Sequence, residues 1–452
     1  MEHFDKVLPY YWRELPKNSL LAAFRFLSSF IKFLLALYFP SRWFKRLPTQ
    51  HDIDAVELFL KKAEALSVID TKRFVIEFFL FHAAVVRFDL TKFKYGIGIF
   101  AGASALFFYT GLSFSIARRI LDYAKPRLDT DDVKQLIIYD LLDTQHLFLK
   151  GQWNDINEYN EDLVNRNLRI GEVWAAVQHY YWHALPKIFQ GHFDAAKIMV
   201  TKLNEIAEAY GNDIYQLLKY LLNIYLLIEC RDINEAAAEV NRGIDLAQKE
   251  GWGLSILNMC SLKASIDLLM KNMEEAGKSL DQANQIRSAV KAAPIQLSAF
   301  YRSQFAYHLR HMEDSSGSVY KEEASEHRRY AFKSGKMLIK ACQKAALYRT
   351  ECYRLMGIYT WLTLDQKGAS KWWQKAISEG ERLGALPQLS RTYAEIGKRF
   401  LATEGELSSP DVNRTKEPLQ KAKTMFRDLR LRHDLEDLNL VVSRISPDTF
   451  EI

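Results

Sequence analysis

The chain has 452 residues, and 48% of them are hydrophobic, which excludes an intrinsically disordered protein. It holds only 20 glycines and 11 prolines, which predicts helices, because sheets need turn residues about every eight to twelve positions. Residues 1–50 carry eight Lys/Arg and three Asp/Glu, and so account for +5 of the net charge of +6. The remainder is nearly balanced, which argues against a nucleic-acid-binding stripe along it.

The first 50 residues are predicted to form an N-terminal capping segment. Residues 20–39 are strongly apolar and predict a helix, with Arg25 and Lys32 seven positions apart on one helical face. Each charge would cost about 2.5–3.5 kcal/mol near the centre of a bilayer, which disfavours a spanning helix. The basic-aromatic sequence SRWFKR follows, which is typical of membrane surfaces. Three alternatives stay open for residues 18–46: a helix packed on the first repeat, an interfacial helix and a spanning helix.

From residue 51 the apolar pattern predicts a series of helical hairpins, ending in a capping helix and a frayed tail. The expected domain therefore covers residues 51–443, and residues 444–452 form the tail. The expected hairpins lie at 52–88, 95–124, 131–165, from 171, at 213–247, around 264–283, around 306 with a polar insertion at 311–321, at 351–378 and from 393 to 427, followed by a cap at 431–443.

Residues 96–117 contain no charged side chain and are long enough to resemble a membrane span. However, the spacing from Ala105 to Ala117 equals the spacing from Gly357 to Ala369 in the best-formed hairpin. A helix that is apolar all round also fits the interior of a repeat stack. We therefore expect a repeat here rather than a span.

The stretch 351–378 defines the register of the hairpins. Gly357 and Ala369 fall where two helix backbones must approach closely, and Trp373 fills the space beside them. This pattern resembles the tetratricopeptide repeat, whose period is about 34 residues. The resemblance implies an all-α protein, a right-handed α-solenoid of about eight or nine antiparallel helical hairpins.

A solenoid of this kind has a concave groove lined by the first helix of each hairpin, which suits an extended peptide or a partner helix. In such repeats the groove-facing positions lie six and three before the small residue of the first helix, and one and four after it. We expect ten side chains to form the partner-binding groove: Asn258, Ser261, Ser265, Ser303, Tyr307, Arg310, Glu351, Arg354, Trp361 and Arg391. The alternative is that these are ordinary exposed residues.

No motif predicts catalysis or a bound cofactor. His179 and His183 have the spacing of a zinc-binding helix but lack a third ligand, so they are interpreted as a packing face. His308 and His311 are interpreted as a solvated helix end. The chain has neither a P-loop nor a nucleophile elbow. The four cysteines form no C-x-x-C pair and are expected to be reduced, as in a cytoplasmic protein: Cys230, Cys260, Cys342 and Cys352.

The order of elements also resembles, more weakly, the helical-repeat region of large bacterial signalling ATPases, kinases and cyclases. In those proteins a Pro-bounded apolar segment precedes degenerate repeats, and residues 15–40 would be that segment here. The sequence therefore predicts a non-catalytic scaffold or sensor module that binds a protein or peptide. The alternative is a membrane-associated adaptor anchored through residues 18–46.

Overall fold

The fold is described from a computed structural model of the whole chain. The structure describes residues 6, 19–39, 46–69, 71–92, 96–314, 321–403 and 412–445. Within these ranges the chain forms α-helices and short 3-10 helices, and no β-strand beyond one isolated bridge between Arg46 and Phe88. Most of the basic-aromatic sequence at 41–46 and the tail from residue 446 lie outside the described residues. The predicted all-α class is confirmed.

The chain divides into two compact units. Unit 1 comprises residues 1–146 and 157–179, and unit 2 comprises residues 147–156 and 180–452. Two helices, α7 (Val133–Lys150) and α9 (Val173–Gln190), contribute residues to both. The other helices of unit 1 are α2 (Ser19–Tyr38), α3 (Gln50–Ile69), α4 (Thr71–Val85), η2 (Leu90–Lys92), α5 (Gly96–Tyr109), α6 (Phe114–Ala124), η3 (Lys125–Arg127) and α8 (Glu161–Arg169).

The core of unit 1 is built around aromatic side chains. Phe30 of α2 meets Phe79 of α4 edge-on, with ring centroids 5.2 Å apart, and Phe33 stacks on Phe107 of α5 at 6.3 Å. Nearly every residue of α5 is buried, so the part of the charge-free run in this helix lies inside the unit, packed against α6. Gly111 adopts φ 62° at the turn between these helices, as the hairpin requires. Of the helices that the structure describes, none combines the length and the apolar content that a bilayer-spanning segment requires.

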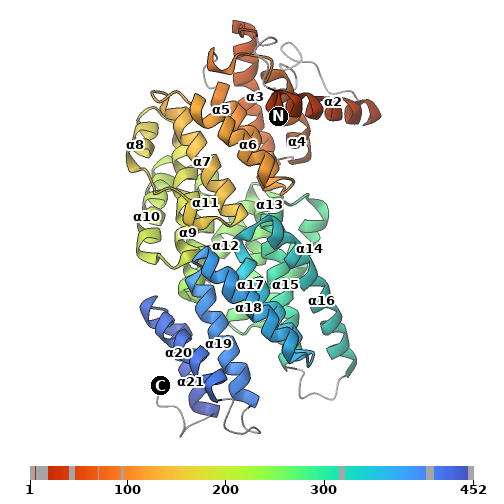
Figure 1. Cartoon of the computed structure of the whole chain (residues 1–452), viewed down its shortest axis with the longest axis vertical. Coiled ribbons are helices and arrows are strands. Elements are labelled where there is room, and N and C mark those ends of the chain that lie inside the picture. The colour runs from red at the N-terminus through yellow and green to blue at the C-terminus, as the bar shows by residue number, and fades with distance from the viewer. Residues whose placement is uncertain are drawn as a thin grey trace. The chain divides into compact units, whose positions relative to one another are not determined.

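Unit 2 is a stack of antiparallel hairpins, seen as paired coils in Figure 1. Its helices are α10 (Phe193–Tyr210), α11 (Asp213–Cys230), α12 (Ile233–Lys249), α13 (Gly253–Leu269), α14 (Met273–Ala289), α15 (Pro294–Asp314), α16 (Lys321–Lys344), α17 (Arg349–Leu362), α18 (Gln366–Leu383), α19 (Leu386–Thr403), α20 (Val412–Asp428) and α21 (Arg432–Ile445), with short turns η4 (Trp153–Asp155) and η6 (Ala346–Tyr348).

The hairpin of α17 and α18 shows why these residues form a repeat. Asp365 caps α18, because its Oδ1 accepts a hydrogen bond from the Gly368 amide at 2.8 Å. Trp373 of α18 lies against Gly357 of α17, and a Cβ added at Gly357 would come within 2.2 Å of the Trp373 indole nitrogen. Ala369 and Trp373 are fully buried. The predicted packing role of these three residues is confirmed.

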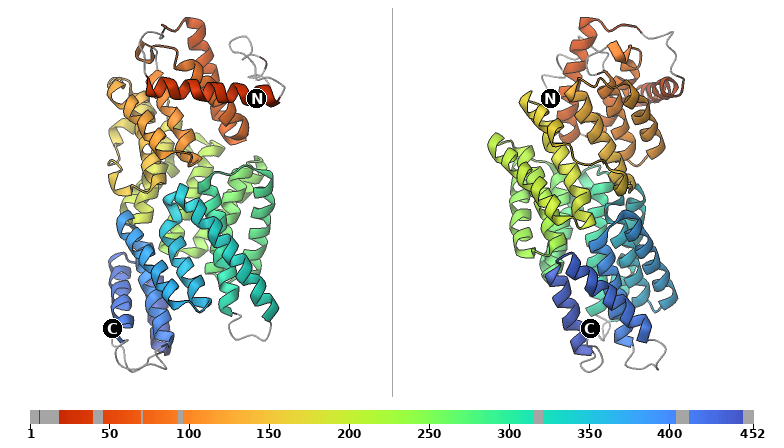
Figure 2. Two further views of the ribbon diagram at one scale, coloured as in Figure 1. Left: turned by 45° about the vertical axis from the view of Figure 1, so that its right-hand side comes forward. Right: turned by 60° about the vertical axis from the view of Figure 1, so that its left-hand side comes forward.

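The first helices of successive hairpins also contact one another. α11 packs on α13, α13 on α15, α15 on α17, and α17 on α19, while the C-terminal helix α21 packs on α19 and α20. The two views of Figure 2 show α13 to α18 as one layered group of neighbouring helices. We term α11, α13, α15, α17 and α19 the inner helices, because they line the candidate site.

Candidate functional site

Buried polar side chains concentrate on the inner helices of unit 2. Such groups need partners, since an unpaired buried charge or hydrogen-bonding group is costly. The buried polar residues of these helices are Glu229 on α11, Ser261, Ser265 and Asp267 on α13, Ser298, Arg302 and Ser303 on α15, Thr350 on α17, and Gln388, Ser390, Arg391 and Thr392 on α19.

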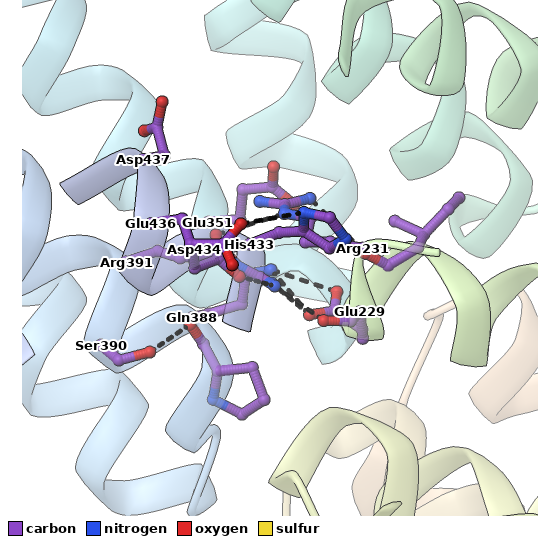
Figure 3. A network of polar contacts seen from close by, with 12 residues as sticks. Glu229, Arg231, Glu351, Gln388, Ser390, Arg391, His433, Asp434, Glu436 and Asp437 are labelled. Atoms are coloured by element: carbon purple, nitrogen blue, oxygen red, sulfur yellow. Dashed lines mark hydrogen bonds and ion pairs between the residues drawn. The ribbon is translucent and has the colours of Figure 1, made fainter. Parts of the chain in front are cut away.

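Arg391 joins helices that are far apart in the sequence. Its guanidinium forms an ion pair with the carboxylate of Glu229, and its Nη2 donates to the Glu229 carbonyl oxygen at 2.8 Å. Gln388, one turn earlier on α19, donates to both carboxylate oxygens of Glu229 at 3.1 and 3.3 Å. Figure 3 shows these side chains converging from the two helices. The inner face of α19 is thus tied directly to α11.

Asp434 of α21 lies between two arginines. Arg391 Nη2 contacts its Oδ2 at 2.8 Å, and Arg231 Nε contacts its Oδ1 at 3.2 Å. Burial alone would raise the pKa of Asp434, but the charges and hydrogen bonds of the two arginines outweigh it and hold that pKa well below its usual range. Arg231 occupies the C-cap of α11 with φ 65°, a left-handed conformation that a non-glycine residue rarely adopts.

Arg302 of α15 forms a second buried centre. Its Nη1 lies 3.3 Å from Glu351 Oε2 of α17, its Nη2 donates to Ser265 Oγ at 2.5 Å, and its guanidinium stacks over the Tyr348 ring at 4.4 Å. Burial opposes ionisation of Glu351, yet Arg302 and Arg354 lower the pKa of that carboxyl below its ordinary value. Glu351 therefore stays charged inside the unit.

Gln388 connects the two centres. While donating to Glu229, it accepts a long hydrogen bond of 3.5 Å from Arg354, which also pairs with Glu351 at 3.3 Å. We term the connected set the ionic network. It consists of Glu229, Arg231, Arg302, Glu351, Arg354, Gln388, Arg391 and Asp434.

An open pocket of about 700 Å³ adjoins the network on the side of α21. Its lining includes Arg231 and Asp434 of the network, and Arg310 near the end of α15. Lys271 and several carboxylates complete the rim, with Leu268 and Leu269 at its apolar side. Because basic, acidic and apolar groups alternate within one pocket, it can hold a chain that carries different side chains.

The predicted groove residues fall into three groups. One of them, Arg310, lines the pocket. Five form polar contacts between or along the inner helices: Ser265, Ser303, Glu351, Arg354 and Arg391. The other four bond or pack elsewhere. Asn258 donates to the Tyr225 hydroxyl at 3.4 Å, Ser261 donates to the Leu257 carbonyl at 2.6 Å, Tyr307 stacks edge-on with His311, and Trp361 packs on Trp373.

Two features of the expected groove need correction. Ser261, Ser303 and Arg391 are buried, whereas an exposed wall was expected. Successive inner helices pack on one another, so these positions meet groups of the same unit. Trp361 belongs to the hydrophobic cluster with Trp373 and Phe400, because it lies at the turn where the two helices of the hairpin converge. The roles of the ten residues in partner binding stay predictions.

Sequence reasoning missed Glu229, Arg231, Arg302, Gln388 and Asp434. The first two lie in the hairpin with the weakest repeat pattern, and Asp434 lies in the capping helix. Arg302 and Gln388 do not occupy the positions expected to face the groove. The Arg231–Asp434 pair joins residues 203 positions apart, so no local sequence pattern predicts it.

Two histidine pairs can now be placed. In unit 1, His179 is fully buried and its Nδ1 lies 3.3 Å from Asp140 Oδ2, an acidic neighbour that the sequence reasoning did not anticipate. In unit 2, the interpretation of His308 and His311 as a solvated helix end is wrong. His308 Nδ1 lies 3.0 Å from Nδ1 of His327 on α16, and His311 stacks on the same ring at 4.1 Å, because the hairpin brings α16 alongside α15.

Comparisons with known proteins place the chain near no described family. No family model matches it, and no curated protein is similar to it in sequence. Among the solved structures that match is a Rap protein in complex with Competence and Sporulation Factor. That structure shares 12% identity, covers 78% of this chain and 98% of its own, and has a TM-score of 0.48. A likeness this distant bears on neither the site nor the function.

Proposed function

We propose that unit 2 is a non-catalytic interaction module that binds an extended peptide or a partner helix at the pocket beside the ionic network. One observation carries this proposal: a largely buried network of four arginines and three carboxylates lies next to an open pocket of mixed chemistry. Buried ion pairs are often no more stabilising than apolar side chains of similar volume. Arginines held in place by such a network are well suited to recognising a charged partner.

The chemistry of the pocket favours a polypeptide ligand. Its rim combines Arg310 and Lys271 with the carboxylates of Asp232 and Glu235, so both signs of charge are present. A nucleic acid would favour a surface of uniform positive charge. The main-chain and side-chain groups of a peptide can instead pair with both signs while an apolar side chain contacts Leu268. A role in signalling, which the weaker family resemblance implied, stays a prediction.

The test is a selection followed by affinity measurement. Random peptides displayed on phage are selected against the full chain, and a selected peptide is measured by fluorescence anisotropy. We expect Arg310→Ala to weaken binding at least about tenfold, since one charged contact contributes about 1.5–3 kcal/mol. Arg242→Ala on the outer helix α12 is the matched control, because both arginines are about half exposed and pair within their own helices. Failure to enrich peptides, or equal losses in both variants, would contradict the proposal.

We propose a second function for unit 1, attachment to an anionic membrane surface through α2. Phe24, Leu27, Ile31 and Leu35 follow one another at three- or four-residue spacing on one face of this helix. Their exposed fractions are 73%, 53%, 47% and 53%. The opposite face packs on α4, so the exposed face has no role in that packing.

The charge of the segment favours a lipid surface over a protein partner. At 100° per residue, Arg25 and Lys32 lie along one edge of the exposed apolar face. Basic residues at the edge of an apolar face can reach anionic headgroups while the face enters the acyl boundary. The net charge of +5 over residues 1–50 adds long-range attraction to such a surface.

Flotation with vesicles tests the attachment. The full chain should float with vesicles that contain phosphatidylserine, and less with phosphatidylcholine alone. Ile31→Glu should release it by placing a charge in the apolar face, while Ile198→Glu on α10 should not, although Ile198 is 61% exposed. A wild-type chain that stays unbound with both vesicles would exclude the attachment.

A further inference from the structure

The carboxylate of Asp434 is placed like a bound ligand. It lies between Arg231 of α11 and Arg391 of α19, of which Arg391 is buried and Arg231 has 20% of its side chain exposed. Of these groups, only Asp434 comes from outside the inner helices. With Glu229 as the second acid, the four charges balance. If Asp434 left, this centre would hold one positive charge more than it has carboxylates, and leaving a buried cation unpaired is strongly unfavourable.

The helix that supplies this carboxylate has few other attachments. Among its described residues, α21 buries only Leu438 and Val442, together with Leu431 just before its first residue. Within the part of the chain that the structure describes, its other ion pair to the inner helices joins Asp437 to Lys398 of α19, and the Asp437 side chain is 61% exposed. Exposed pairs of this kind contribute little to stability. The attachment of α21 therefore depends mainly on a small apolar contact and on Asp434.

The pocket leads to the same two-arginine position. Arg231 and Asp434 form part of its wall, and His433 and Asp437 belong to the same helix. Figure 3 shows His433, Asp434 and Asp437 on α21, with Asp434 directed towards Arg231 and Arg391. A chain that enters beside Arg310 would reach Arg231 at the point where Asp434 now sits, and Arg391 lies on the other side of the Asp434 carboxylate.

We propose that Asp434 occupies the position that a carboxylate of the bound peptide takes, so that α21 is an internal competitor of the ligand. This inference rests on the function proposed for unit 2 and names its ligand class, a peptide carrying an acidic side chain or a free terminal carboxylate. Binding exchanges one carboxylate for another. The two arginines stay paired throughout, and α21 is released because its main polar contact is lost.

The probe is a fluorescent peptide with the sequence of residues 430–445, which carries the Asp434 carboxylate, and the protein is the full chain. We expect Asp434→Asn in the chain to bind the probe about tenfold more tightly than the wild type does, because the internal competitor is weakened. A probe with asparagine at the Asp434 position should bind about tenfold less tightly. Glu436→Gln in the chain is the control, since Glu436 is exposed on the same helix and should leave affinity unchanged.

Two further arms settle the source of the carboxylate and the fold of the variant. Probes with free and amidated C-termini distinguish a terminal carboxylate from an acidic side chain, and dependence on either one supports the proposal. If circular dichroism shows that Asp434→Asn does not fold, Leu438→Ala replaces it, because this change loosens α21 and leaves both arginines in place. In hydrogen exchange, amides of α21 in the wild-type chain should exchange faster when the probe is bound.

Equal affinity of the wild type and the Asp434→Asn chain for the probe, or binding that needs no carboxylate, would overturn the inference. The phage selection distinguishes a failure of this inference from a failure of the function proposed for unit 2. Selected peptides that bind near Arg310 without displacing α21 would support the interaction module and exclude only the role of α21 as a competitor. Absence of any selected peptide would remove the module itself.

Discussion

Gly357 is a residue at which the packing tolerates no side chain. A Cβ there would lie 2.2 Å from the Trp373 indole nitrogen, and Trp373 is fully buried and cannot move away. We expect Gly357→Ala to lower the free energy of unfolding by about 1–3 kcal/mol, the usual cost of overpacking a core. Urea denaturation measures it.

Gly102→Ala on α5 is the matched control for that substitution. Both glycines are helical, but the nearest atom to a Cβ at Gly102 is 3.9 Å away on Phe78. Alanine is favoured over glycine within a helix by about 0.5–1 kcal/mol, so this change should be neutral or slightly stabilising. Equal stabilities of the two variants would show that close packing is not what requires glycine at position 357.

His308 predicts a pH dependence of stability. Burial, together with the neighbouring His327 and His311, lowers the pKa of His308 from 6.5 to about 4. As the pH falls below 6.5, the His308 imidazole becomes protonated in the unfolded chain but stays neutral in the folded chain. The neutral imidazole's contribution to the free energy of unfolding is therefore fully present above pH 6.5, and it is lost as the pH falls towards 4.

Urea titrations at several pH values between 7 and 4 measure this effect. We expect His308→Gln to flatten the dependence relative to the wild type, because glutamine removes the titrating group. His433→Gln is the control, since its ring is 66% exposed on α21. If the slopes of wild type and His308→Gln were the same, some other group would be responsible for the titration.

At the scale of the helix, the hairpins were predictable because their packing rule is local. Ala264, Ala276 and Ala283 lie in the hairpin expected around residues 264–283, and all three are fully buried. The hairpin expected at residues 351–378 is also present, and Asp365 caps its second helix. Each of these features depends on side chains within about one repeat of 34 residues, which a single sequence displays directly.

The faces of the inner helices could not be predicted in the same way. Whether a position such as Ser303 meets solvent or another helix depends on how sharply successive hairpins turn. That turn accumulates from small rotations at every hairpin contact, and no single motif records it. Ser303 donates instead to the Ser261 carbonyl at 2.7 Å, so the expected groove wall is an interhelical contact.

At the scale of the whole molecule, unit 2 departs from a simple repeat array. In such arrays each repeat contacts only its neighbours, and stability is roughly a sum of adjacent terms. Here Arg391 ties α19 to α11, which lies four hairpins earlier. We therefore expect unit 2 to unfold in one cooperative step, rather than by fraying from its ends.

Arg391→Met tests how much this ion pair between α19 and α11 stabilises unit 2. It leaves the buried carboxylate of Glu229 without its cation, so we expect a loss of about 3–5 kcal/mol in the free energy of unfolding. The double variant Glu229→Gln with Arg391→Met should recover part of that loss, because the unpaired charge is gone. Exposed Arg242→Ala should cost less than about 0.5 kcal/mol. If Arg391→Met lowered the free energy of unfolding as little as Arg242→Ala does, the ion pair would not be what stabilises unit 2.

The pairing of Arg231 with Asp434 has a consequence for how the chain is made. These residues are 203 positions apart, so the ribosome adds Asp434 roughly 10–40 s after Arg231 at ordinary elongation rates. The early hairpins can form as they emerge, but Glu229 has no Arg391 until α19 is made, and Arg231 has no Asp434 until α21 is made. This part of the fold therefore stays incomplete, and open to chaperones and proteases, until α21 has been translated.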